Sequence, residues 1–584
     1  MSDKIKTIPY GISDFSNMRR RNGYYVDNTW GIPLLEALPY QLFLRPRRFG
    51  KSLLLSILHY YYDVNSIDRF DELFAGTWIH EHPTDDRGQF LVLHLDFSKT
   101  CGETLEEMQE SFEKCCRIAL DAFCNAYKNL IPAEILEEMA RQTTFRDALN
   151  ALTSNLPIYS NQRIFILIDE YDNFSNRLLA QAGADAYRAL CHGTGFFKSF
   201  FALLKAQNTV ITNILLTGVS PMTLDDVTSG FNIAENVSQS PQLATLCGFT
   251  HAQIREAFDY YATAGKFPLD CEQAFRLVTD WYDHYRFSTN NDLQVCNPVL
   301  LIGFLYRCMA EGGFPTDMVD ENLRTDYRKL RHVVTTNGRL NGKFNALEQL
   351  VADGAVTTSL IRSFQEDTLN RPESFLSLLF YYGMVTFGEF VNGKQSLTIP
   401  NQLMRQFAAD FLLHGYMDAC NVDARTNELA DKLGDMAYLG TWRPALEIAA
   451  QVLKETLSVR DLLDGEKAVQ TALASLLTAS KAFAVRTEHR AGFGFADLAL
   501  APRLITSPGL KYAALIEVKY LKKSEKVTKA AKAALLAEAK DQLECYAQDN
   551  NLAEAWQLKP SGTVTLIRLA VVFHGEDLLL AEEI

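Results

Sequence analysis

A short stretch near the amino terminus, RPRRFGKSLLL at residues 45–55, constrains the fold more than any other part of the sequence. An apolar run at residues 41–44 precedes it, and a helical pattern at residues 52–62 follows it. A loop that leaves a strand and opens a helix is the context in which Gly-Lys-Ser binds phosphate, because N–H groups at a helix N-terminus attract phosphate oxygens. The sequence therefore predicts a nucleotide site.

The loop departs from the usual phosphate-loop pattern at one position. That pattern has a glycine five places before Gly50, and Arg45 stands there instead. We expect Pro46 to fix φ and two arginines of the loop to add positive field, which would partly compensate for the lost turn freedom. The residues expected to contact the nucleotide are Arg47, Arg48, Phe49, Gly50, Lys51 and Ser52, with Lys51 on the β- and γ-phosphates and Ser52 on Mg²⁺.

Two further apolar runs end in polar residues. The run RIFILIDEYDNF ends in Asp169 and Glu170, which suits an aspartate that holds the Mg²⁺ shell and a glutamate that orients or deprotonates the attacking water. The alternative is that Asp169 and Glu170 are simply two exposed carboxylates at the end of a buried strand, with no part in nucleotide binding. The run ITNILLTGVSP ends in Thr217, Gly218 and Ser220. We expect a polar side chain at this strand end to reach the γ-phosphate, and Thr217 is the candidate.

Strand and helix patterns alternate through the first 240 residues, which predicts a parallel sheet with helices on both faces. The strand candidates are residues 41–44, 91–97, 164–168 and 210–216, and the long helical stretches include residues 52–62 and 104–127. The candidate at 91–97 lies between Lys51 and Asp169 in sequence. This order fits the NTPase branch in which a strand intervenes between the two motif strands and a glutamate follows the aspartate.

Composition limits the classes of protein. A chain of 584 residues predicts roughly three or four domains. We find no run of about 20 apolar residues and no signal-peptide core, so we expect a cytoplasmic protein with no membrane partner. The 11 cysteines form no CxxC pair, which favours reduced thiols over disulfides or zinc. The net charge of −14 excludes a wholly basic nucleic-acid binder but not a local basic patch.

The middle of the chain is mostly helical, with one exception. The stretch SFLSLLFYYGMVTFGEFVNGKQSLTIPN predicts a helix and then two strands joined at Asn392-Gly393. This is the outline of a winged helix, and both a packing domain and a nucleic-acid reader remain open. The expected domains are residues 1–245, 246–455 and 456–584.

The last portion predicts a second α/β domain. A helix at 466–480 leads to strand candidates at 483–487, 495–499 and 514–520, then a Lys/Ala-rich helix at 527–547 and an apolar strand at 563–573, in the order αβββαβ. Glu517 and Lys519 are two apart on one strand and so share a face. If Asp497 also faces them, two carboxylates and an ammonium converge, which suits Mg²⁺ or Mn²⁺.

This convergence is typical of metal-dependent phosphodiester hydrolysis, in which Asp497 and Glu517 bind the metal and Lys519 positions water or stabilises the developing charge. Residues 481–532 contain 11 Lys/Arg and 4 Asp/Glu, against the acidic trend of the chain. The pattern alone also fits ordinary surface charge. Glu488 and Glu466 are accessory candidates, each for a further metal carboxylate. Gln542 and Tyr546, one helical turn apart, fit a helix face that looks toward the site. The stretch CHGTG at 191–195 suggests a Cys/His nucleophile but has no identifiable catalytic partner.

Six stretches, IPYGISDF, YYVDNT, FLRPRRFGKSLLLS, LIDEYDN, TGVSPMTLDDVTSGFNIA and WYDHYRF, closely resemble bacterial AAA-ATPase-like proteins with a C-terminal PD-(D/E)xK nuclease domain. The resemblance covers most of the chain. It implies a P-loop NTPase sheet of the AAA/ASCE type, a helical and winged-helix-like middle, and a restriction-endonuclease-like αβββαβ domain.

By the same resemblance Arg45 is a family trait, and Lys51, Ser52, Asp169 and Glu170 are the nucleotide and Mg²⁺ residues. Relatives often have Gly-Arg and an apolar or proline residue before the nuclease aspartate; Phe495 and Ala496 stand there in this chain, which puts one phosphate contact in doubt. Arg286, in WYDHYRF, is a weaker candidate for a nucleotide sensor than for a structural residue.

The sequence thus predicts an ATP-binding protein whose nucleotide state controls a Mg²⁺-dependent nuclease acting on DNA, in defence, mobile-element handling or repair. One alternative is a nucleotide switch or scaffold whose nuclease fold only grips nucleic acid or protein. Another is an ATPase motor acting on protein. AAA-type sites often lie between subunits, but a single-chain switch is equally compatible.

Overall fold

The computed structural model describes residues 4–102, 104–173, 196–221, 234–319, 341–362, 364, 371–420, 425–457, 465–491 and 494–584, without the side chains of 196–197, 341–344, 415–420, 457 and 488–491. The chain divides into two compact units. The first comprises Met1–Cys271, Tyr282–Ala310 and Ser359–Phe387, and the second Glu272–Trp281, Glu311–Thr358 and Gly388–Ile584. The expected middle region, 246–455, is therefore shared between the units.

The first unit is built on a parallel five-stranded sheet in the order β2-β3-β4-β1-β5. The strands are β1 (Tyr40–Leu44), β2 (Phe90–Asp96), β3 (Arg163–Asp169), β4 (Ile211–Gly218) and β5 (Glu235–Asn236). The four longer strands are the predicted ones, each within two residues at either end. Their side chains are buried almost throughout, as expected for a sheet covered on both faces.

The strand that separates the two motif strands in space is β4, which pairs with β1 on one side and β3 on the other. The strand predicted at 91–97, β2, instead lies at the edge beyond β3. The assignment to the NTPase branch with an inserted strand is confirmed, but the inserted strand is β4. Sequence order alone could not distinguish them, because chain order and spatial order differ in a doubly wound sheet.

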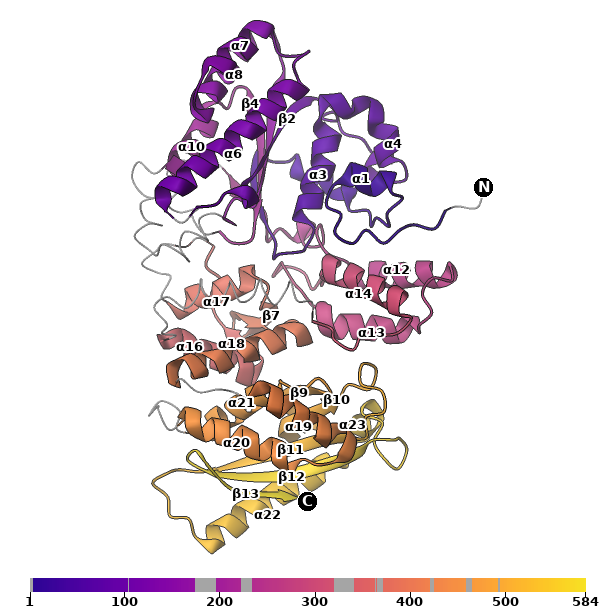
Figure 1. Cartoon of the computed structure of the whole chain (residues 1–584), viewed down its shortest axis with the longest axis vertical. Coiled ribbons are helices and arrows are strands. Elements are labelled where there is room, and N and C mark those ends of the chain that lie inside the picture. Colours follow the sequence, from indigo (N-terminus) through magenta and orange to yellow (C-terminus); the bar gives the residue numbers. More distant parts are fainter. Residues whose placement is uncertain are drawn as a thin grey trace. The chain divides into compact units, whose positions relative to one another are not determined.

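Helices cover both faces of this sheet. The first helix after the loop, α3 (Lys51–Tyr62), contacts β2 and β3, while α6 (Leu105–Ala126) packs along β2 on the opposite face (Figure 1). Thr104 caps α6 in a reciprocal capping box with Glu107, which explains where that helix begins. The other helices described in this unit are α1 (Phe15–Arg20), α2 (Ile32–Leu35), α4 (Phe70–Phe74), α5 (Trp78–Glu81), α7 (Ala133–Arg141), α8 (Phe145–Tyr159), α10 (Phe196–Ala206), α12 (His251–Thr263), α14 (Pro298–Glu311) and α17 (Pro372–Tyr381).

The second unit is built on a mixed sheet in the order β13-β12-β11-β10-β9. Its strands are β9 (Phe483–Ala491), β10 (Gly494–Pro502), β11 (Tyr512–Leu521), β12 (Thr565–His574) and β13 (Asp577–Glu583). Only β11 and β12 are parallel. The predicted order αβββαβ is present, followed by β13, which the sequence analysis missed because its outer residues are acidic and it follows a tight turn at Gly575.

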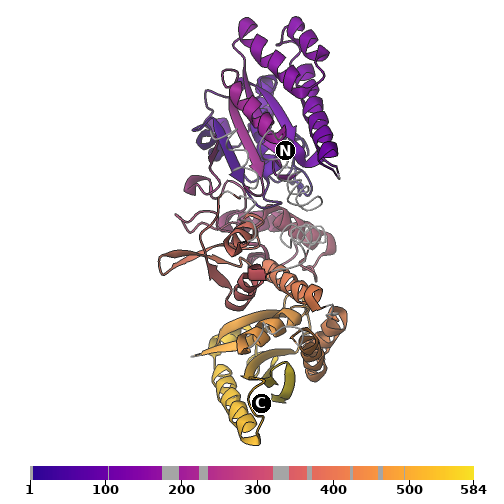
Figure 2. The same cartoon turned by 90° about the vertical axis from the view of Figure 1, so that its left-hand side faces the viewer.

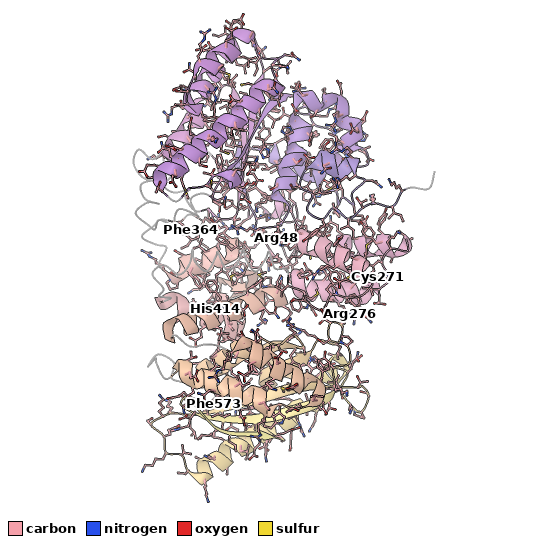
Figure 3. All side chains as sticks on the ribbon, viewed as in Figure 1. Arg48, Cys271, Arg276, Phe364, His414 and Phe573 are labelled. Atoms are coloured by element: carbon pink, nitrogen blue, oxygen red, sulfur yellow. The ribbon has the colours of Figure 1, made fainter. Side chains whose placement is uncertain are left out.

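The helix that joins the two parallel strands, α22 (Lys529–Tyr546), packs on β10, β11 and β12 (Figure 2). Two other helices, α19 (Thr426–Leu439) and α21 (Glu466–Leu477), also contact β11. Among the residues that the structure describes, the remaining helices of this unit are α16 (Asn341–Asp353), α18 (Gln402–Cys420), α20 (Arg443–Leu457) and α23 (Asn550–Ala555), and α13 (Cys271–Tyr282) lies mostly in this unit. The sheet core is fully buried, as at Phe573 on β12 (Figure 3).

The predicted hairpin is present between β7 (Thr386–Val391) and β8 (Lys394–Thr398). Both turn residues have positive φ, 51° at Asn392 and 74° at Gly393, which is the geometry that an Asn-Gly turn favours. These strands form a three-stranded sheet with β6 (Ala355–Thr357), and α17 precedes the hairpin as expected. In the described part of the chain, every helix is too short or too polar to span a bilayer.

Candidate active sites

The phosphate loop connects β1 to α3 and takes its shape from Gly50. The φ of Gly50 is +89°, a left-handed conformation that a side chain would strain, and α3 begins at the next residue. Arg48 also has a positive φ of 69°. The N–H groups at the start of α3 are thus presented by a tight turn, as anion binding requires.

Lys51 is buried beneath this turn. Its Nζ donates hydrogen bonds to the backbone oxygens of Arg45, at 2.9 Å, and Pro46, at 3.1 Å. Burial lowers the pKa of Lys51, and the negative charges of Asp169 and Glu170 oppose that shift. The ammonium is therefore held by its own loop and faces the two carboxylates, where a phosphate would compete for it.

Asp169 joins three of the predicted residues, which come from different elements. Its Oδ2 accepts a hydrogen bond of 2.6 Å from Ser52 Oγ, and its Oδ1 accepts one of 2.8 Å from Thr217 Oγ1. The backbone N–H of Glu170 donates to the same Oδ1 at 2.9 Å. The ends of β3 and β4 and the start of α3 thus meet at one carboxylate, whose oxygens, with that of Ser52, suit a Mg²⁺ shell.

Glu170 follows Asp169 in a left-handed conformation, with a φ of +50°. It is half-buried, and burial raises the pKa of its carboxyl, with Lys51 and Arg47 opposing the rise. A carboxylate with a raised pKa is a better general base. The charge of Arg47 acts on this carboxyl, so one of the predicted loop residues lies near Glu170. Arg48 is half-buried on the same loop (Figure 3).

Asp172 is a site residue that the sequence analysis missed. Its Oδ2 accepts hydrogen bonds from Ser220 N and Oγ, both at 2.9 Å, and its Oδ1 accepts one of 3.1 Å from Val219 N. Asp172 therefore fixes the segment after β4 to the segment after β3. The second aspartate of DEYDN was the available signal. The Ser220 hydroxyl, considered for γ-phosphate contact, donates to Asp172 instead.

The side chain of Arg45 is buried in the core of the first unit. Its side chain is 1% exposed and donates to the backbone oxygens of Leu44, Ser238 and Leu243. Its guanidinium lies 4.3 Å from the ring centroids of both Phe43 and Phe287. The position that usually holds glycine is thus occupied by a core side chain, and Arg47 and Arg48 stay the loop arginines predicted to contact the nucleotide.

Two other predicted residues have structural side chains. The ring of Phe49 is buried against Tyr285, with centroids 5.0 Å apart, so only its backbone is available to a phosphate. Arg286 donates to the backbone oxygens of Ser288 and Asn291 and pairs with Asp292 at 3.0 Å. These contacts close a surface turn and support the structural interpretation of Arg286.

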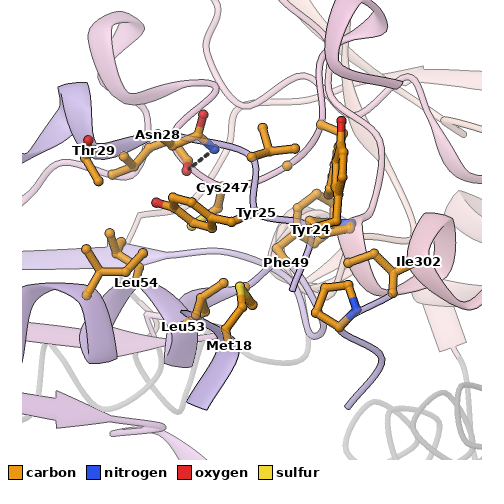
Figure 4. A pocket seen from close by; sticks show the side chains of 18 of the residues that line it. Met18, Tyr24, Tyr25, Asn28, Thr29, Phe49, Leu53, Leu54, Cys247 and Ile302 are labelled. Carbon is orange, nitrogen blue, oxygen red and sulfur yellow. Dashed lines mark hydrogen bonds between the residues drawn. The ribbon is translucent and has the colours of Figure 1, made fainter. Parts of the chain in front are cut away.

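A mainly apolar cavity of about 90 Å³ borders the phosphate loop (Figure 4). Gly50 and Leu53 line it from the loop and α3, and Tyr24 and Tyr25 from the amino-terminal segment. Asn28, also in the lining, donates to Leu246 O at 3.1 Å. The cavity suits a flat, mainly apolar group such as a nucleotide base. It unites segments far apart in sequence, so no local pattern indicated it.

The second site lies on β10 and β11. Leu498 pairs with Ile516, so the next residues along the two strands are Asp497 and Glu517. Asp497 Oδ2 accepts a hydrogen bond of 2.8 Å from Val518 N, which fixes the carboxylate against β11. Asp497 and Glu517 therefore lie next to each other on adjacent strands, as predicted.

Glu517 is 1% exposed, and burial raises the pKa of its carboxyl to about 7, with the negative charge of Asp497 adding to the rise. Lys519 Nζ lies 3.2 Å from Glu517 Oε1. Among the described residues, the buried Oε2 of Glu517 has no hydrogen-bond partner. A buried carboxylate that needs positive charge, with one oxygen unused and a second carboxylate beside it, fits a divalent cation.

One face of α22 looks toward this site. Lys519 Nζ lies 3.0 Å from Glu538 Oε1. Burial alone would lower the pKa of Lys519, but its hydrogen bonds to Glu538 and Glu517 raise it. Tyr546 donates to Phe495 O at 2.8 Å, and burial together with Glu517 and Asp497 raises its pKa to about 12. The prediction that this helix faces the site is confirmed. Glu538, two turns before Tyr546, was missed.

The remaining candidates differ in how far the structure describes them. Gln542 lies on the same face of α22, one turn from both Glu538 and Tyr546, with a buried Oε1. Burial of its carboxyl raises the pKa of Glu466, although the residue as a whole is exposed, and the charge of Lys519 opposes the rise. Glu488 belongs to β9, but its side chain lies outside the description, as does the whole stretch 191–195.

The two sites coincide with matches to known families. Residues 9–228 match a family described as a predicted AAA-ATPase, and residues 464–583 match the PD-(D/E)XK nuclease superfamily. The chain therefore carries an AAA-ATPase-like domain and a C-terminal PD-(D/E)XK superfamily domain, and the predicted resemblance is confirmed. A curated protein of Azotobacter chroococcum mcd 1, described as an uncharacterized protein in the vnfD 5′ region, is 25% identical over 446 residues, covering 73% of this chain and 74% of that protein.

Proposed function

We propose that this protein binds and hydrolyses ATP, and that its nucleotide state controls a C-terminal Mg²⁺-dependent nuclease that hydrolyses DNA. The observation that carries the proposal is the buried carboxylate of Glu517, which lies between Asp497 and Lys519 and leaves one oxygen unused. A buried acid of this kind costs stability unless a cation uses it, which supports a catalytic metal site over a merely structural one.

At the first site, each residue has a role that its present contacts support. Lys51 would exchange its two backbone acceptors for β- and γ-phosphate oxygens. Ser52 and Asp169 would hold Mg²⁺, Thr217 lies beside them, and Glu170 would accept the proton of the attacking water. The apolar cavity beside Gly50 would take the base of the nucleotide.

At the second site, Asp497 and Glu517 would hold Mg²⁺ or Mn²⁺. A bound metal there supplies charge neutralisation at the scissile phosphate and a more acidic water. Lys519 donates to Glu517 and Glu538, so its ammonium lies beside the carboxylate that would hold the metal and would stabilise the developing negative charge there. Glu538 restrains the ammonium of Lys519 from the side opposite the sheet.

The surroundings favour a nucleic-acid substrate, and the resemblance to nucleases favours DNA over RNA. Residues 522–530 are exposed and follow directly on β11, which carries the site. Lys522, Lys523, Lys526 and Lys529 belong to this segment, so a phosphate backbone reaching the site would pass a basic surface. Handling of foreign or mobile DNA is a setting consistent with these activities.

One rival has specific support. Lys519 is engaged by two carboxylates, and the acidic chain has a net charge of −14, both of which fit a nuclease fold that only grips a partner. Such a scaffold would bind nucleic acid or protein in a nucleotide-dependent way without cutting.

The discriminating experiment measures cleavage of plasmid DNA, linear single-stranded DNA and RNA by the full chain with Mg²⁺ or Mn²⁺. We expect metal-dependent cleavage of DNA, its loss in Lys519→Ala, and its retention in Lys540→Ala, which removes a lysine of α22 outside the described contacts of the site. Binding without cleavage by the wild-type chain would favour the scaffold. Equal cleavage by Lys519→Ala would refute the assignment of the site.

A further inference from the structure

The motif WYDHYRF contains a cluster that neither proposed site uses. Asp283 and His284, from this motif, meet His251 at the first residue of α12. One ligand atom from each of the three residues lies within 4.8 Å of the other two. Among the described residues, this is the one group of three His, Cys, Asp or Glu side chains whose ligand atoms lie this close together. All three residues belong to the first unit.

The separations match those of ligands around one metal ion. His251 Nε2 is in direct hydrogen-bond contact with Asp283 Oδ2, and His284 Nδ1 lies 3.7 Å from the same oxygen. Ligand atoms in a tetrahedral site with bonds of roughly 2.1 Å are about 3.4 Å apart. Small side-chain adjustments would therefore bring all three atoms into one coordination sphere.

The scaffold holds these residues in place without a metal. Asp283 is fully buried, and His284 has a positive φ of 69°, which directs its backbone through a tight corner. Backbone bridges pair Phe249 with Cys296 and Tyr285 with Val295, so the segments that carry the three residues are tied together. A carboxylate and imidazoles that are prepositioned in this way lose little conformational entropy on binding an ion.

We propose that His251, Asp283 and His284 bind a divalent transition-metal ion, with zinc as the best fit. Two imidazoles and one carboxylate suit Zn²⁺ better than Mg²⁺, which prefers oxygen ligands. The side chains of His251 and His284 are 49% and 41% exposed, so a fourth position is open to water. Gln294 Oε1, now 3.1 Å from His284 Nδ1, would move away or supply that ligand.

The position gives the ion a structural role. Tyr285 follows the cluster directly, and its ring packs on Phe49 of the phosphate loop at 5.0 Å between centroids. Zinc would brace this corner against α12 and so stabilise the wall on which the loop packs. The inference does not rest on the proposed function, because it concerns metal content and stability rather than ATP or DNA.

The test measures zinc bound by the full chain after chelator treatment and dialysis against Zn²⁺ with excess Mg²⁺, which occupies the carboxylate sites. His284→Gly removes one ligand and preserves the positive φ, and His251→Ala removes another. His414→Ala, on α18, is the matched control (Figure 3).

We expect wild type and His414→Ala to bind about one zinc ion more per chain than either cluster variant, and to gain melting temperature with zinc that the variants do not gain. Both cluster variants should remain folded by circular dichroism without metal. Equal zinc content and equal zinc-induced stabilisation in all four proteins would overturn the proposal.

Discussion

The Ser52 hydroxyl donates a hydrogen bond of 2.6 Å to Asp169 Oδ2 and so joins the start of α3 to the end of β3. These are the two halves of the nucleotide site, 117 residues apart in the chain. Since β4 lies between β1 and β3, Thr217 reaches the same carboxylate from the intervening strand. The departure at Arg45 therefore leaves the metal-binding part of the site assembled.

Replacing Lys51 by alanine should weaken ATP binding roughly 10- to 100-fold, because a charged hydrogen-bond donor to phosphate is lost. Binding of a fluorescent ATP analogue would measure this change. Lys99→Ala, in the same unit with a side chain 76% exposed, is the control and should bind normally. Unchanged affinity in Lys51→Ala would show that the loop does not bind the phosphates.

Replacing Glu170 by glutamine should separate binding from turnover. ATP should still bind, because Lys51, Ser52 and Asp169 remain, while hydrolysis should fall about 10²- to 10⁴-fold with the loss of the general base. Steady-state phosphate release, measured beside ATP affinity, checks this prediction. A variant that hydrolyses ATP at the wild-type rate would assign the base to another residue.

Replacing Arg45 by glycine restores the common loop pattern but should harm the protein. The variant loses three hydrogen bonds to buried backbone oxygens and two cation–π contacts, so unfolding should become easier by about 3 kcal/mol or more. Denaturant unfolding of Arg45→Gly beside Arg47→Gly tests this. Equal or greater stability of Arg45→Gly would contradict the structural role of Arg45.

Glu517 predicts a pH dependence of stability. Its pKa is raised from 4.5 to about 7, so between these values the folded chain binds more protons than the unfolded chain, and stability falls as pH rises through this window. Glu517→Gln should remove that cost, on the order of 3 kcal/mol at pH 8, and leave stability near pH 4 unchanged. The free energy of unfolding of wild type and Glu517→Gln, measured at pH 8 and near pH 4 in the presence of a chelator, checks the sign of this change. A Glu517→Gln chain that is less stable than wild type at pH 8, by more than near pH 4, would contradict the predicted sign.

Much of the fold was predictable because it depends on local signals. The apolar runs that became β1 to β4, the Asn392-Gly393 turn and the order αβββαβ all follow from periodicity and turn chemistry. The two-residue β5 and the polar-edged β13 were not predictable, because their strand character comes from pairing with β1 and β12 rather than from their own residues.

The candidate sites show the same division. Glu517 and Lys519 could be placed together because strand alternation fixes which residues share a face, and Asp169 was identifiable because it ends an apolar run. The inward orientation of Arg45 and the approach of Glu538 depend on tertiary packing, on Phe287 in one case and on the placement of α22 in the other. The apolar cavity also required the folded chain, since it brings Tyr24 beside Gly50.

The central claim is that nucleotide at the first site controls cutting at the second. The direct measurement is the rate of metal-dependent DNA cleavage by wild type and Lys51→Ala, each with and without ATP, with Lys519→Ala as the inactive reference. We predict that ATP changes the wild-type rate by roughly tenfold or more, a coupling typical of allosteric systems, and leaves the Lys51→Ala rate unchanged. Cleavage by wild type that is indifferent to ATP, or an equal response in Lys51→Ala, would contradict the claim.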